Sequence, residues 1–326
     1  MSRSKTRWEQ TIPHLTPETQ ASVQQDIPLS RHTALRVGGP ADFFVSARET
    51  SVLAELAAVS QMHNLPLLLL GEGSNICVSD NGVRGMVVQN ACRHAEIGAV
   101  TRVDAGHNFM RLFLLTMRSD LSGLEFAVGI PGSVGGALVS NAGAYRANIC
   151  DLVRDVEVVE CGERKVVGSE WMEFSYRDSR LRRGDGLPAV LLSVWLELQH
   201  TRKSDIRAKA KDFQMQRLLK QPWEPSAGSF FKNVLSHELA ESLPNLPLAM
   251  KQAGVVPAAY LSEACGCKGL QIGGAGIASR HANFLINLGH AAAADIRAVA
   301  ETVKAKVFDK FGVLLEEEVL YVGEWS

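Results

Sequence analysis

The chain has 326 residues, of which 46% are hydrophobic and 21% charged, and 34 basic residues against 35 acidic ones give a net charge of -1. A chain of this length predicts about two or three domains whose cores need no disulfide bonds. The balanced charge and an aromatic content of only 6% argue against a nucleic-acid-binding protein.

The same sequence gives no sign of a membrane or metal protein. Met1–Arg7 is basic, but no apolar segment of a signal peptide follows it. The longest apolar runs, such as Leu65–Leu70, are far too short to cross a bilayer. The six cysteines lack the C-x-x-C spacing of zinc sites, so we expect reduced thiols and no metal. We therefore expect a cytoplasmic protein that binds no membrane and for which no oligomer is required.

The first part of the chain alternates β-like and helical segments. Hydrophobic spacing predicts a strand over 41–47, a helix over 49–63 and a buried strand over 66–70. Further along, the pattern predicts short strands within 84–105, a helix over about 108–120, and strands over 153–159 and 189–198.

Near residue 200 the sequence changes from a strand pattern to a charged helical pattern, which predicts a domain boundary. A charged amphipathic helix is expected over 204–219, ending at Gln221-Pro222. We expect a first domain over 1–200, split near residue 95 into two parts, and a second over 201–326. In the second, helices are expected near 256–265 and 292–311, with a final strand over 313–322.

Two glycine-rich segments are candidates for binding a phosphate group. The first, Gly71-Glu-Gly73-Ser74-Asn75, follows the buried strand, where backbone N–H groups can converge on an anion. It is not a Rossmann G-x-G-x-x-G motif, because the third glycine would fall on Ile76. A tight turn with no ligand is an equally good interpretation of this segment alone.

The second glycine-rich segment contains more glycines than the first, and also a proline. It contains Gly129, Ile130, Pro131, Gly132, Ser133, Gly135 and Gly136, followed by Asn141 and Gly143. Several glycines free the backbone while the proline fixes one angle, so many N–H donors can face a diphosphate. Two such loops separated by strands are typical of one dinucleotide lying between two subdomains.

Three further segments contain polar residues with possible chemistry. Arg177 can bind a carboxylate through its planar fork of donors, although a lone arginine is often a surface charge. Ser229 lies between Gly228 and Phe230, where we expect partial burial, and a serine hydroxyl can deliver a proton. In a strand over Glu316-Glu-Glu318, the side chains of Glu316 and Glu318 would point to one face. The alternative interpretation is an acidic strand edge that is only solvated.

These motifs together resemble one known family. The run GLEFAVGIPGSVGGALVSNAGAY (Gly123–Tyr145), with LRVGGPAD (Leu35–Asp42) and GEGSN (Gly71–Asn75), is similar to the FAD-binding motifs of UDP-N-acetylenolpyruvoylglucosamine reductases. The resemblance runs from about residue 30 to the C-terminus. It implies an α+β fold: an FAD-binding domain of the vanillyl-alcohol-oxidase type, with two α+β subdomains, and a smaller α+β substrate-binding domain. His32-Thr33 departs from the family's usual Asn-Thr.

The resemblance also assigns roles to single residues. It implies a catalytic arginine at Arg177 in Tyr-Arg-x-Ser, a proton-donating serine at Ser229 in Ala-Gly-Ser-x-Phe-Lys-Asn, and a catalytic glutamate at Glu318 before a valine. The glycine-segment residues named above would bind FAD. Substrate contacts are expected at Tyr176, Asn233, Lys268 and His281, with a core histidine as the alternative for His281. The short spacing between Arg177 and Ser229 indicates the branch without an inserted tyrosine loop.

The implied activity is the NADPH-dependent reduction of UDP-N-acetylglucosamine enolpyruvate to UDP-N-acetylmuramate through non-covalently bound FAD, a step of peptidoglycan precursor synthesis. Two alternatives stay open at this point. One is an FAD oxidase of the same fold, and the other is a nucleotide-sugar sensor that has kept the pocket. The sequence leaves undecided the oligomeric state, the preference for NADPH over NADH, and the role of Cys265 and Cys267.

Overall fold

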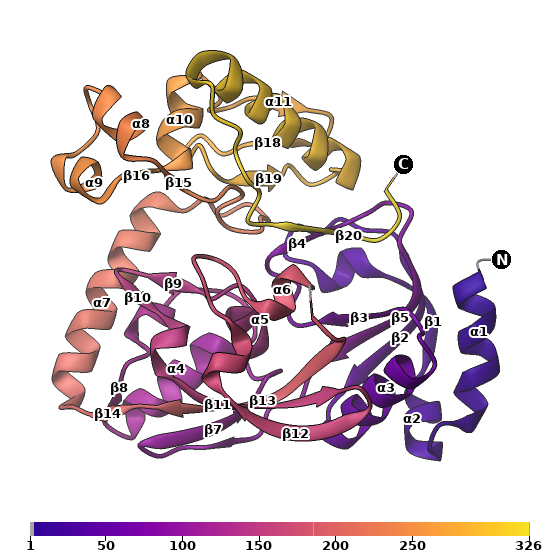
Figure 1. The fold of residues 1–326 in the computed structure, drawn as a ribbon. Helices are drawn as coiled ribbons and strands as arrows, with labels where there is room; N and C mark the ends of the chain where they lie inside the picture. Colours follow the sequence, from indigo (N-terminus) through magenta and orange to yellow (C-terminus); the bar gives the residue numbers. More distant parts are fainter. Residues whose placement is uncertain (1–2, 185, 326) are drawn as a thin grey trace. The chain divides into compact units, whose positions relative to one another are not determined.

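The computed structural model describes residues 3–184 and 186–325 (Figure 1). The chain forms two compact units, each of which gathers segments that are distant in sequence. The first contains residues 1–28, 40–73 and 83–219, and the second contains 29–39, 74–82 and 220–326. The long C-terminal segment of the second unit begins at Lys220, about twenty residues beyond the expected boundary.

The first unit opens with α1 (Arg3–Thr11) and α2 (Pro17–Ser22), which pack on its first sheet. Trp8 is fully buried, and its indole Nε1 donates to the carbonyl of Pro66 at 2.9 Å. Thr16 donates to Glu55 through both its backbone N–H and its hydroxyl, each at 2.7 Å. These bonds fix the N-terminal helices against the helix and strand that precede the first glycine-rich segment.

The first sheet has the order β1-β2-β5-β3. Its strands are β1 (Gln24–Pro28), β2 (Pro40–Ala47), β5 (Val83–Asn90) and β3 (Leu67–Leu70). Strands β2, β5 and β3 are parallel, so their carboxyl ends meet at one edge of the sheet. The expected strands over 41–47 and 66–70 and the helix over 49–63, which is α3 (Thr50–Met62), are confirmed within one residue at most boundaries.

The second sheet of this unit is antiparallel and has the order β12-β11-β13-β7-β6. Its strands are β6 (Ala95–Glu96), β7 (Val100–Asp104), β11 (Val153–Glu160), β12 (Glu163–Gly168) and β13 (Ala189–Glu197). Leu53 and Leu56 of α3 share one buried cluster with Val159, Val190 and Leu192 of this sheet. Helix α3 thus packs against both sheets and joins the two subdomains (Figure 1).

Further elements complete the first unit. They are α4 (Phe109–Arg118), β8 (Leu121–Ser122), α5 (Val134–Val139), β9 (Gly143–Ala144), β10 (Ala147–Asn148), α6 (Arg180–Arg183), β14 (Gln199–His200) and α7 (Lys203–Lys220). Short 3-10 helices cover Ile12–His14, Glu125–Ala127, Ile149–Leu152 and Ser169–Met172. Helix α7 belongs almost wholly to this unit because Ile206 and Ala210 are buried in the core of the second sheet. That packing explains why the boundary lies after α7 and not before it.

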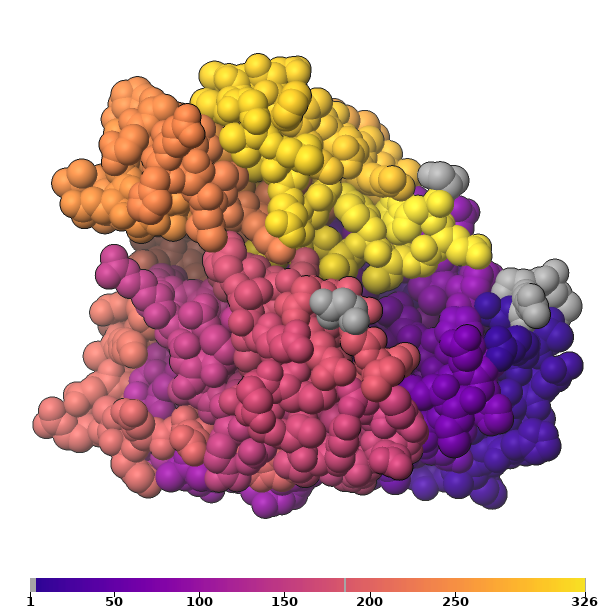
Figure 2. Space-filling view, in the orientation of Figure 1, coloured from indigo at the N-terminus to yellow at the C-terminus, as the bar shows by residue number. Residues whose placement is uncertain are grey.

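The second unit is built around the long helix α11 (Ala293–Phe311), which buries Ile296, Val299 and Val303. The other elements are β4 (Ile76–Val78), β15 (Val234–Leu235), α8 (His237–Ser242), α9 (Leu248–Ala253), β16 (Val255–Val256), α10 (Ala258–Ala264), β17 (Gln271–Ile272), β18 (Ala275–Ile277), β19 (Leu285–Asn287) and β20 (Leu320–Val322), with a 3-10 helix over Leu29–His32. Figure 2 shows the orange surface that α8 and α9 contribute. The expected helices near 256–265 and 292–311 are α10 and α11.

The C-terminal strand is shorter than the sequence pattern predicts. The expected strand over 313–322 is regular only over Leu320–Val322, where β20 pairs in parallel with the three residues of β4. Upstream, the chain makes one isolated antiparallel bridge, between Glu317 and Phe231. A strand needs a partner for each backbone group, and most of 313–319 has none in a sheet.

The described residues contain free cysteine thiols but no membrane-spanning helix and no metal-binding group of side chains. Within 3–184 and 186–325, no helix has the length and apolar composition needed to span a membrane. Cys77, Cys92, Cys150, Cys161, Cys265 and Cys267 are free thiols. No group of three or more His, Cys, Asp or Glu side chains in the same ranges is arranged to hold a metal ion.

Candidate active site

The two glycine-rich segments of the first unit lie against each other. A Cβ placed on Gly71 would lie 2.4 Å from the Oγ of Ser133, so only glycine allows this approach. The second segment is also bonded to the residues before α4: the N–H of Phe109 donates to Gly132 at 2.9 Å, and the N–H of Val134 donates to His107 at 2.8 Å. Segments about sixty residues apart in sequence thus form one lining.

This lining has the donors that a diphosphate requires. Gly132 and Ser133 are buried, and their backbone N–H groups have no acceptor among the residues that the structure describes. Gly132 also has a φ of +120°, which favours glycine and directs the local peptide groups away from regular structure. Buried N–H donors without acceptors are unfavourable unless a ligand supplies the acceptor. The residues of this loop therefore fit the phosphate oxygens of an FAD.

Arg177 is held beside the end of the second segment. It lies in a tight turn in which Ser175 and Asp178 bond to each other's backbone, and its φ is +54°. Its Nη1 donates to the carbonyl of Asn141 at 3.3 Å, and its Nη2 donates to the carbonyl of Gly143. The Nδ2 of Asn141 donates to Ser175 at 2.8 Å. The structure thus brings Asn141, Gly143 and Arg177 together, with the exposed ring of Tyr176 next to the guanidinium at 5.5 Å.

Arg217 of α7 lies at the same place, and the sequence analysis did not single it out. Its guanidinium lies 5.5 Å from the ring of Tyr145, and a Cβ on Gly129 would lie 2.9 Å from its Cδ. Burial, and then the charge of Arg177, lower the pKa of Arg217. Its buried Nε has no hydrogen-bond partner in the described part of the chain. On sequence alone it is one of several basic residues of α7, and no motif distinguishes it.

In the second unit, Ser229 and Glu318 come together through backbone pairing. The N–H of Glu318 donates to the carbonyl of Phe230 at 2.8 Å, and the N–H of Lys232 donates to the carbonyl of Glu316 at 2.8 Å. Asn283 fixes the first of these segments, because its side chain accepts from Phe231 at 3.0 Å and donates back at 2.9 Å. Ser229 therefore lies one residue from the residue that bonds directly to Glu318.

Asn75 fixes the other side of the glutamate. Its Nδ2 donates to the carbonyl of Glu318 at 3.1 Å, and its own carbonyl accepts from the N–H of Leu320 at 3.1 Å. Asn75 and Ser74 belong to the second unit, whereas Gly71 and Gly73 of the same motif belong to the first. One continuous glycine-rich segment thus contributes to both units.

One expectation about these side chains is wrong. Ser229 is exposed and not partly buried, because Gly228, with a φ of +78°, turns the chain so that Phe230 enters the core instead. The stretch is not a regular strand, since only Glu317 forms a bridge, and the prediction that Glu316 and Glu318 share one face stays a prediction. Glu316 forms an ion pair with Lys232, and Glu317 forms one with Lys304 at 2.9 Å.

The expected substrate contacts lie in two places within the second unit. The Oδ1 of Asn233 accepts from the N–H of Ala258 at 3.3 Å, at the start of α10. His281 is half-buried, packs on Phe284 at 4.8 Å, and accepts from the N–H of Asn283 through Nδ1 at 3.2 Å. Burial, and then the nearby charges of Lys220 and Lys268, lower the pKa of His281.

Those charges make the surroundings of His281 basic. Lys268 forms an ion pair with Glu263 at 2.6 Å. Lys220, which the sequence analysis did not name, adds a second cation close enough to act on the imidazole. Such a cluster suits an anionic ligand, with the neutral imidazole as a hydrogen-bonding group.

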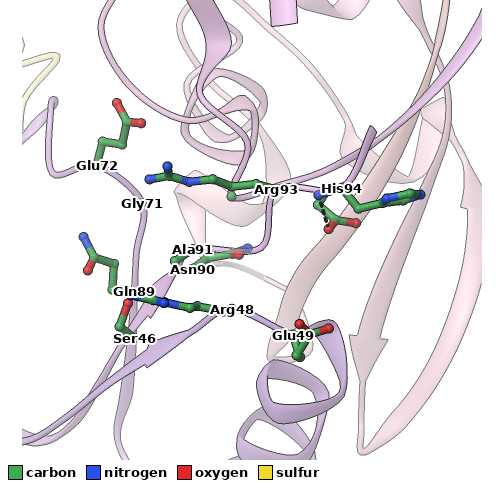
Figure 3. Close-up of a pocket in the computed structure, with 12 residues that line it drawn as sticks. Ser46, Arg48, Glu49, Gly71, Glu72, Gln89, Asn90, Ala91, Arg93 and His94 are labelled. Carbon is green, nitrogen blue, oxygen red and sulfur yellow. Dashed lines mark hydrogen bonds between the residues drawn. The ribbon is translucent and has the colours of Figure 1, made fainter. Parts of the chain in front are cut away.

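A polar cavity of about 760 Å³ lies at the carboxyl ends of β2, β3 and β5 (Figure 3). Of the residues expected to bind FAD, only Gly71 lines it, together with Arg48, Arg93, Gln89 and other polar residues. Open α/β sheets bind ligands outside the carboxyl ends of their parallel strands. This cavity could not be predicted from the sequence, because its lining comes from strand ends far apart in the chain.

Comparisons with known proteins match two parts of the chain to family models. Residues 41–167 match an FAD binding domain, and residues 220–322 match the UDP-N-acetylenolpyruvoylglucosamine reductase C-terminal domain. UDP-N-acetylenolpyruvoylglucosamine reductase of Desulfosudis oleivorans is 38% identical, covering 95% of this chain and 97% of its own. The Bacillus velezensis enzyme of that name is 33% identical, covering 97% and 99%.

A solved structure extends the likeness to three dimensions. The UDP-N-acetylenolpyruvylglucosamine reductase of Thermus caldophilus superimposes with a TM-score of 0.73 at 30% identity, covering 92% of this chain and 98% of its own. The FAD-binding α+β fold expected from the sequence is therefore confirmed. Sequence identity above 30% over nearly the whole length, on the same fold, leads to one conclusion: the chain belongs to the UDP-N-acetylenolpyruvoylglucosamine reductase family.

Proposed function

We propose that this chain is an FAD-dependent oxidoreductase that uses NADPH to reduce UDP-N-acetylenolpyruvoylglucosamine, forming UDP-N-acetylmuramate for peptidoglycan synthesis in the cytoplasm. The observation that carries the proposal is the backbone pairing of the Ser229 and Glu318 segments, which supports a shared site for the hydroxyl and the carboxylate. The lining formed by Gly71 and Ser133 supports FAD as the cofactor. Bound FAD supplies the acceptance of a hydride from NADPH and its delivery to the enolpyruvyl double bond.

Ser229 is proposed to supply the proton that completes the reduction. Once a hydride has been added to the methylene carbon of the enolpyruvyl group, the neighbouring carbon needs a proton to become the lactyl ether. The exposure of Ser229 leaves its hydroxyl accessible to a ligand, and Asn283 fixes the backbone of the next two residues, Phe230 and Phe231. A serine in this position acts as a general acid only if the substrate carbon comes within hydrogen-bonding reach.

Arg177 and Glu318 are proposed to polarise the substrate. Negative charge develops on the enolate and on its carboxylate, and a guanidinium fork that is already oriented stabilises it without reorganisation. The carbonyls of Asn141 and Gly143 provide that orientation for Arg177. Glu318 is half-buried, and the amide of Asn75 fixes its backbone.

The other expected contacts are proposed to bind the nucleotide part of the substrate. Lys268 and His281, with Lys220 near them, form a basic cluster that suits a sugar-nucleotide diphosphate. Tyr176 and Asn233 are proposed as further substrate contacts. The residues proposed to bind FAD are those of the two glycine-rich segments: Gly71, Gly73, Ser74, Asn75, Gly129, Ile130, Pro131, Gly132, Ser133, Gly135, Gly136, Asn141 and Gly143.

Anaerobic stopped-flow absorbance of the flavin band tests the proposal. The purified holoenzyme is reduced with NADPH and then mixed with UDP-N-acetylenolpyruvoylglucosamine in the absence of oxygen. Rapid reoxidation of the flavin by this compound is the expected result. A flavin that stays reduced until air is admitted would instead indicate an oxidase, and the catalytic assignments would fall with the proposal.

Two substitutions separate the half-reactions. Ser229→Ala is expected to slow flavin reoxidation by substrate about 100-fold or more, while reduction by NADPH stays nearly unchanged. Arg177→Lys is expected to slow the same step about 100-fold, because a point charge replaces the oriented fork. Ser226→Ala in the same loop and Arg183→Lys, an exposed arginine that pairs with Glu173, are the matched controls. If Ser229→Ala slowed both half-reactions equally, Ser229 would not be the proton donor.

A further inference from the structure

The hairpin formed by β9 and β10 turns through two residues with a left-handed backbone. Ala144 pairs with Ala147, so Tyr145 and Arg146 form the whole turn, with φ values of +56° and +66°. A two-residue turn of this kind favours Asn-Gly, because a residue with a bulky side chain is strained at positive φ. Such strain persists only where surrounding contacts hold the residue in place, and it is common at functional sites.

Tyr145 contacts two residues of α7 that lie one helical turn apart (Figure 1). Its ring stacks in parallel on the ring of Phe213, with the two centroids 3.9 Å apart, and its hydroxyl donates to the carbonyl of Phe213 at 3.0 Å. The guanidinium of Arg217 lies 5.5 Å from the centre of the same tyrosine ring. Residues four positions apart share one face of a helix, so Tyr145 fixes this face of α7 together with the arginine that extends from it.

Arg217 lies between Tyr145 and the second glycine-rich segment. A Cβ on Gly129 would lie 2.9 Å from the Cδ of Arg217, so the absence of a side chain at residue 129 leaves room for the arginine. Burial lowers the pKa of Arg217, the nearby Tyr145 raises it, and the charge of Arg177 lowers it. Arg217 forms no ion pair with any carboxylate of residues 3–184 and 186–325. A half-buried cation beside a second cation is unfavourable unless an anion joins them.

The same hairpin holds both arginines. The carbonyl of Gly143, in β9, accepts a hydrogen bond from Nη2 of Arg177, and Tyr145, directly after β9, contacts Arg217. A backbone carbonyl thus orients one guanidinium, and an aromatic ring orients the other. Two guanidinium groups held close together suit a single carboxylate, because each offers a planar set of N–H donors to its oxygens.

We propose that Tyr145 is a positioning residue that holds Arg217 beside Arg177, so that both guanidinium groups bind the carboxylate of the enolpyruvyl group. Tyr145 acts through Arg217 and needs no contact of its own with the substrate. The strained turn is the means by which its ring reaches α7. The inference rests on the proposed function, because it takes the enolpyruvyl sugar nucleotide as the substrate.

A double-mutant cycle between Tyr145 and Arg217 tests this role. The dissociation constant of UDP-N-acetylenolpyruvoylglucosamine is measured from the change in flavin absorbance of the oxidised holoenzyme, for wild type and for Tyr145→Phe, Tyr145→Leu, Arg217→Met and the two double variants. Tyr145→Leu removes the ring and the hydroxyl and is expected to weaken binding about tenfold. Tyr145→Phe keeps the ring and is expected to weaken it about threefold.

In the Arg217→Met background, neither substitution of Tyr145 is expected to weaken binding further, because its effect passes through the arginine. Losses that simply add would overturn the proposal, since they would show that Tyr145 does not act through Arg217. The absorbance band of bound FAD checks that each variant is folded. If Tyr145→Leu does not fold, Tyr145→Phe in the two backgrounds makes the same comparison.

UDP-N-acetylglucosamine, which lacks the enolpyruvyl carboxylate, tests which anionic group the two arginines bind. Its dissociation constant is expected to be the same in wild type, Tyr145→Leu and Arg217→Met, and equal weakening of both ligands would overturn the assignment to the carboxylate. Arg146→Gly is the matched control, because Arg146 is the exposed residue of the same turn and glycine suits its positive φ. This variant is expected to bind both ligands like wild type.

The outcomes for this inference and for the proposed function can be distinguished. A wild-type flavin that the enolpyruvyl sugar nucleotide does not reoxidise would overturn the proposed function. Tight binding by wild type with additive losses in the cycle would overturn only the role of Tyr145.

Discussion

The side-chain amide of Asn108 donates to both carboxylate oxygens of Glu72, at 2.9 and 3.0 Å. The same side chain caps α4, because its Oδ1 accepts from the N–H of Arg111 at 2.9 Å. Its backbone neighbours bond to Gly132 and Val134. Asn108 therefore connects the first glycine-rich segment, the start of α4 and the second glycine-rich segment, which are the parts proposed to bind the FAD diphosphate.

Substitutions of Asn108 should separate its two roles. Asn108→Ser keeps a good helix cap but loses the bonds to Glu72, so we expect weaker FAD binding with little change in stability. Asn108→Ala loses both, and we expect an additional decrease of about 1 kcal/mol in the free energy of unfolding. Flavin fluorescence and urea unfolding measure the two effects. Loss of stability in Asn108→Ser without any change in FAD affinity would show that the bond to Glu72 is purely structural.

The contact between Gly71 and Ser133 can be measured with a double-mutant cycle. Gly71→Ala introduces a Cβ at 2.4 Å from the Ser133 Oγ and is expected to lower the free energy of unfolding by about 1–3 kcal/mol. Ser133→Ala removes the oxygen and the α5 cap, at about 1 kcal/mol.

The combination of the two substitutions should be less destabilising than the sum of the single ones. Relief of the clash predicts a coupling of about 0.5 kcal/mol or more, measured by urea unfolding. Strictly additive losses would mean that the two loops do not touch in solution. Gly98→Ala is a suitable control, because Gly98 does not have a left-handed φ and a Cβ there would lie 3.5 Å from the nearest atom, the carbonyl oxygen of Val100.

Arg217 should matter for anionic ligands and not for folding. Its buried Nε has no hydrogen-bond partner in the described chain, and Arg177 lies close enough to lower its pKa. Arg217→Met preserves much of the volume and removes a buried charge, so stability should be unchanged or higher. Because a charge-assisted contact would be lost, the KM for the sugar nucleotide is expected to rise about tenfold or more. Arg207→Met, an exposed residue of the same helix, is the control; an unchanged KM in Arg217→Met would contradict a ligand-binding role.

His281 should make stability depend on pH in a defined direction. Burial lowers its pKa in the folded protein, so the unfolded chain binds more protons below the ordinary value of about 6.5. The stabilisation by the neutral imidazole is complete above that value and decreases as the pH falls through it toward the lower folded pKa. His281→Gln should therefore show a smaller loss of unfolding free energy between about pH 7.5 and about pH 5.5 than wild type.

Urea unfolding at several pH values measures this difference. His107 also has a pKa lowered mainly by burial, so the dependence should decrease in His281→Gln and not vanish. His200→Gln, at the exposed end of β14, serves as the control. An identical pH dependence in wild type and His281→Gln would show that this imidazole does not titrate with folding.

The sequence by itself determined the elements whose signal is local. Helices α3 and α11 and strand β2 follow from hydrophobic spacing within one segment, and the glycine-rich motifs identify where the backbone must turn. The order of the motifs was also enough to indicate the family, since it requires no knowledge of which segments touch. The ion pair of Glu316 and the exposure of Ser229 could not be predicted from local sequence patterns, because side-chain contacts depend on partners elsewhere in the chain.

Only the tertiary structure decided which distant segments meet. Residues 74–82 join the C-terminal unit because β4 pairs with β20, over 200 residues away in the chain, and residues 29–39 join it because Leu35 and Val37 are buried in its core. The same long-range pairing limits the last strand to three residues and places Asn75 on Glu318, whereas the burial of Ile206 and Ala210 keeps α7 with the first unit. Arg48 and Arg93 come to one cavity because parallel strands end at a common edge. A periodic pattern specifies which face of a segment is buried, but the partner of that face is fixed only when the whole chain packs.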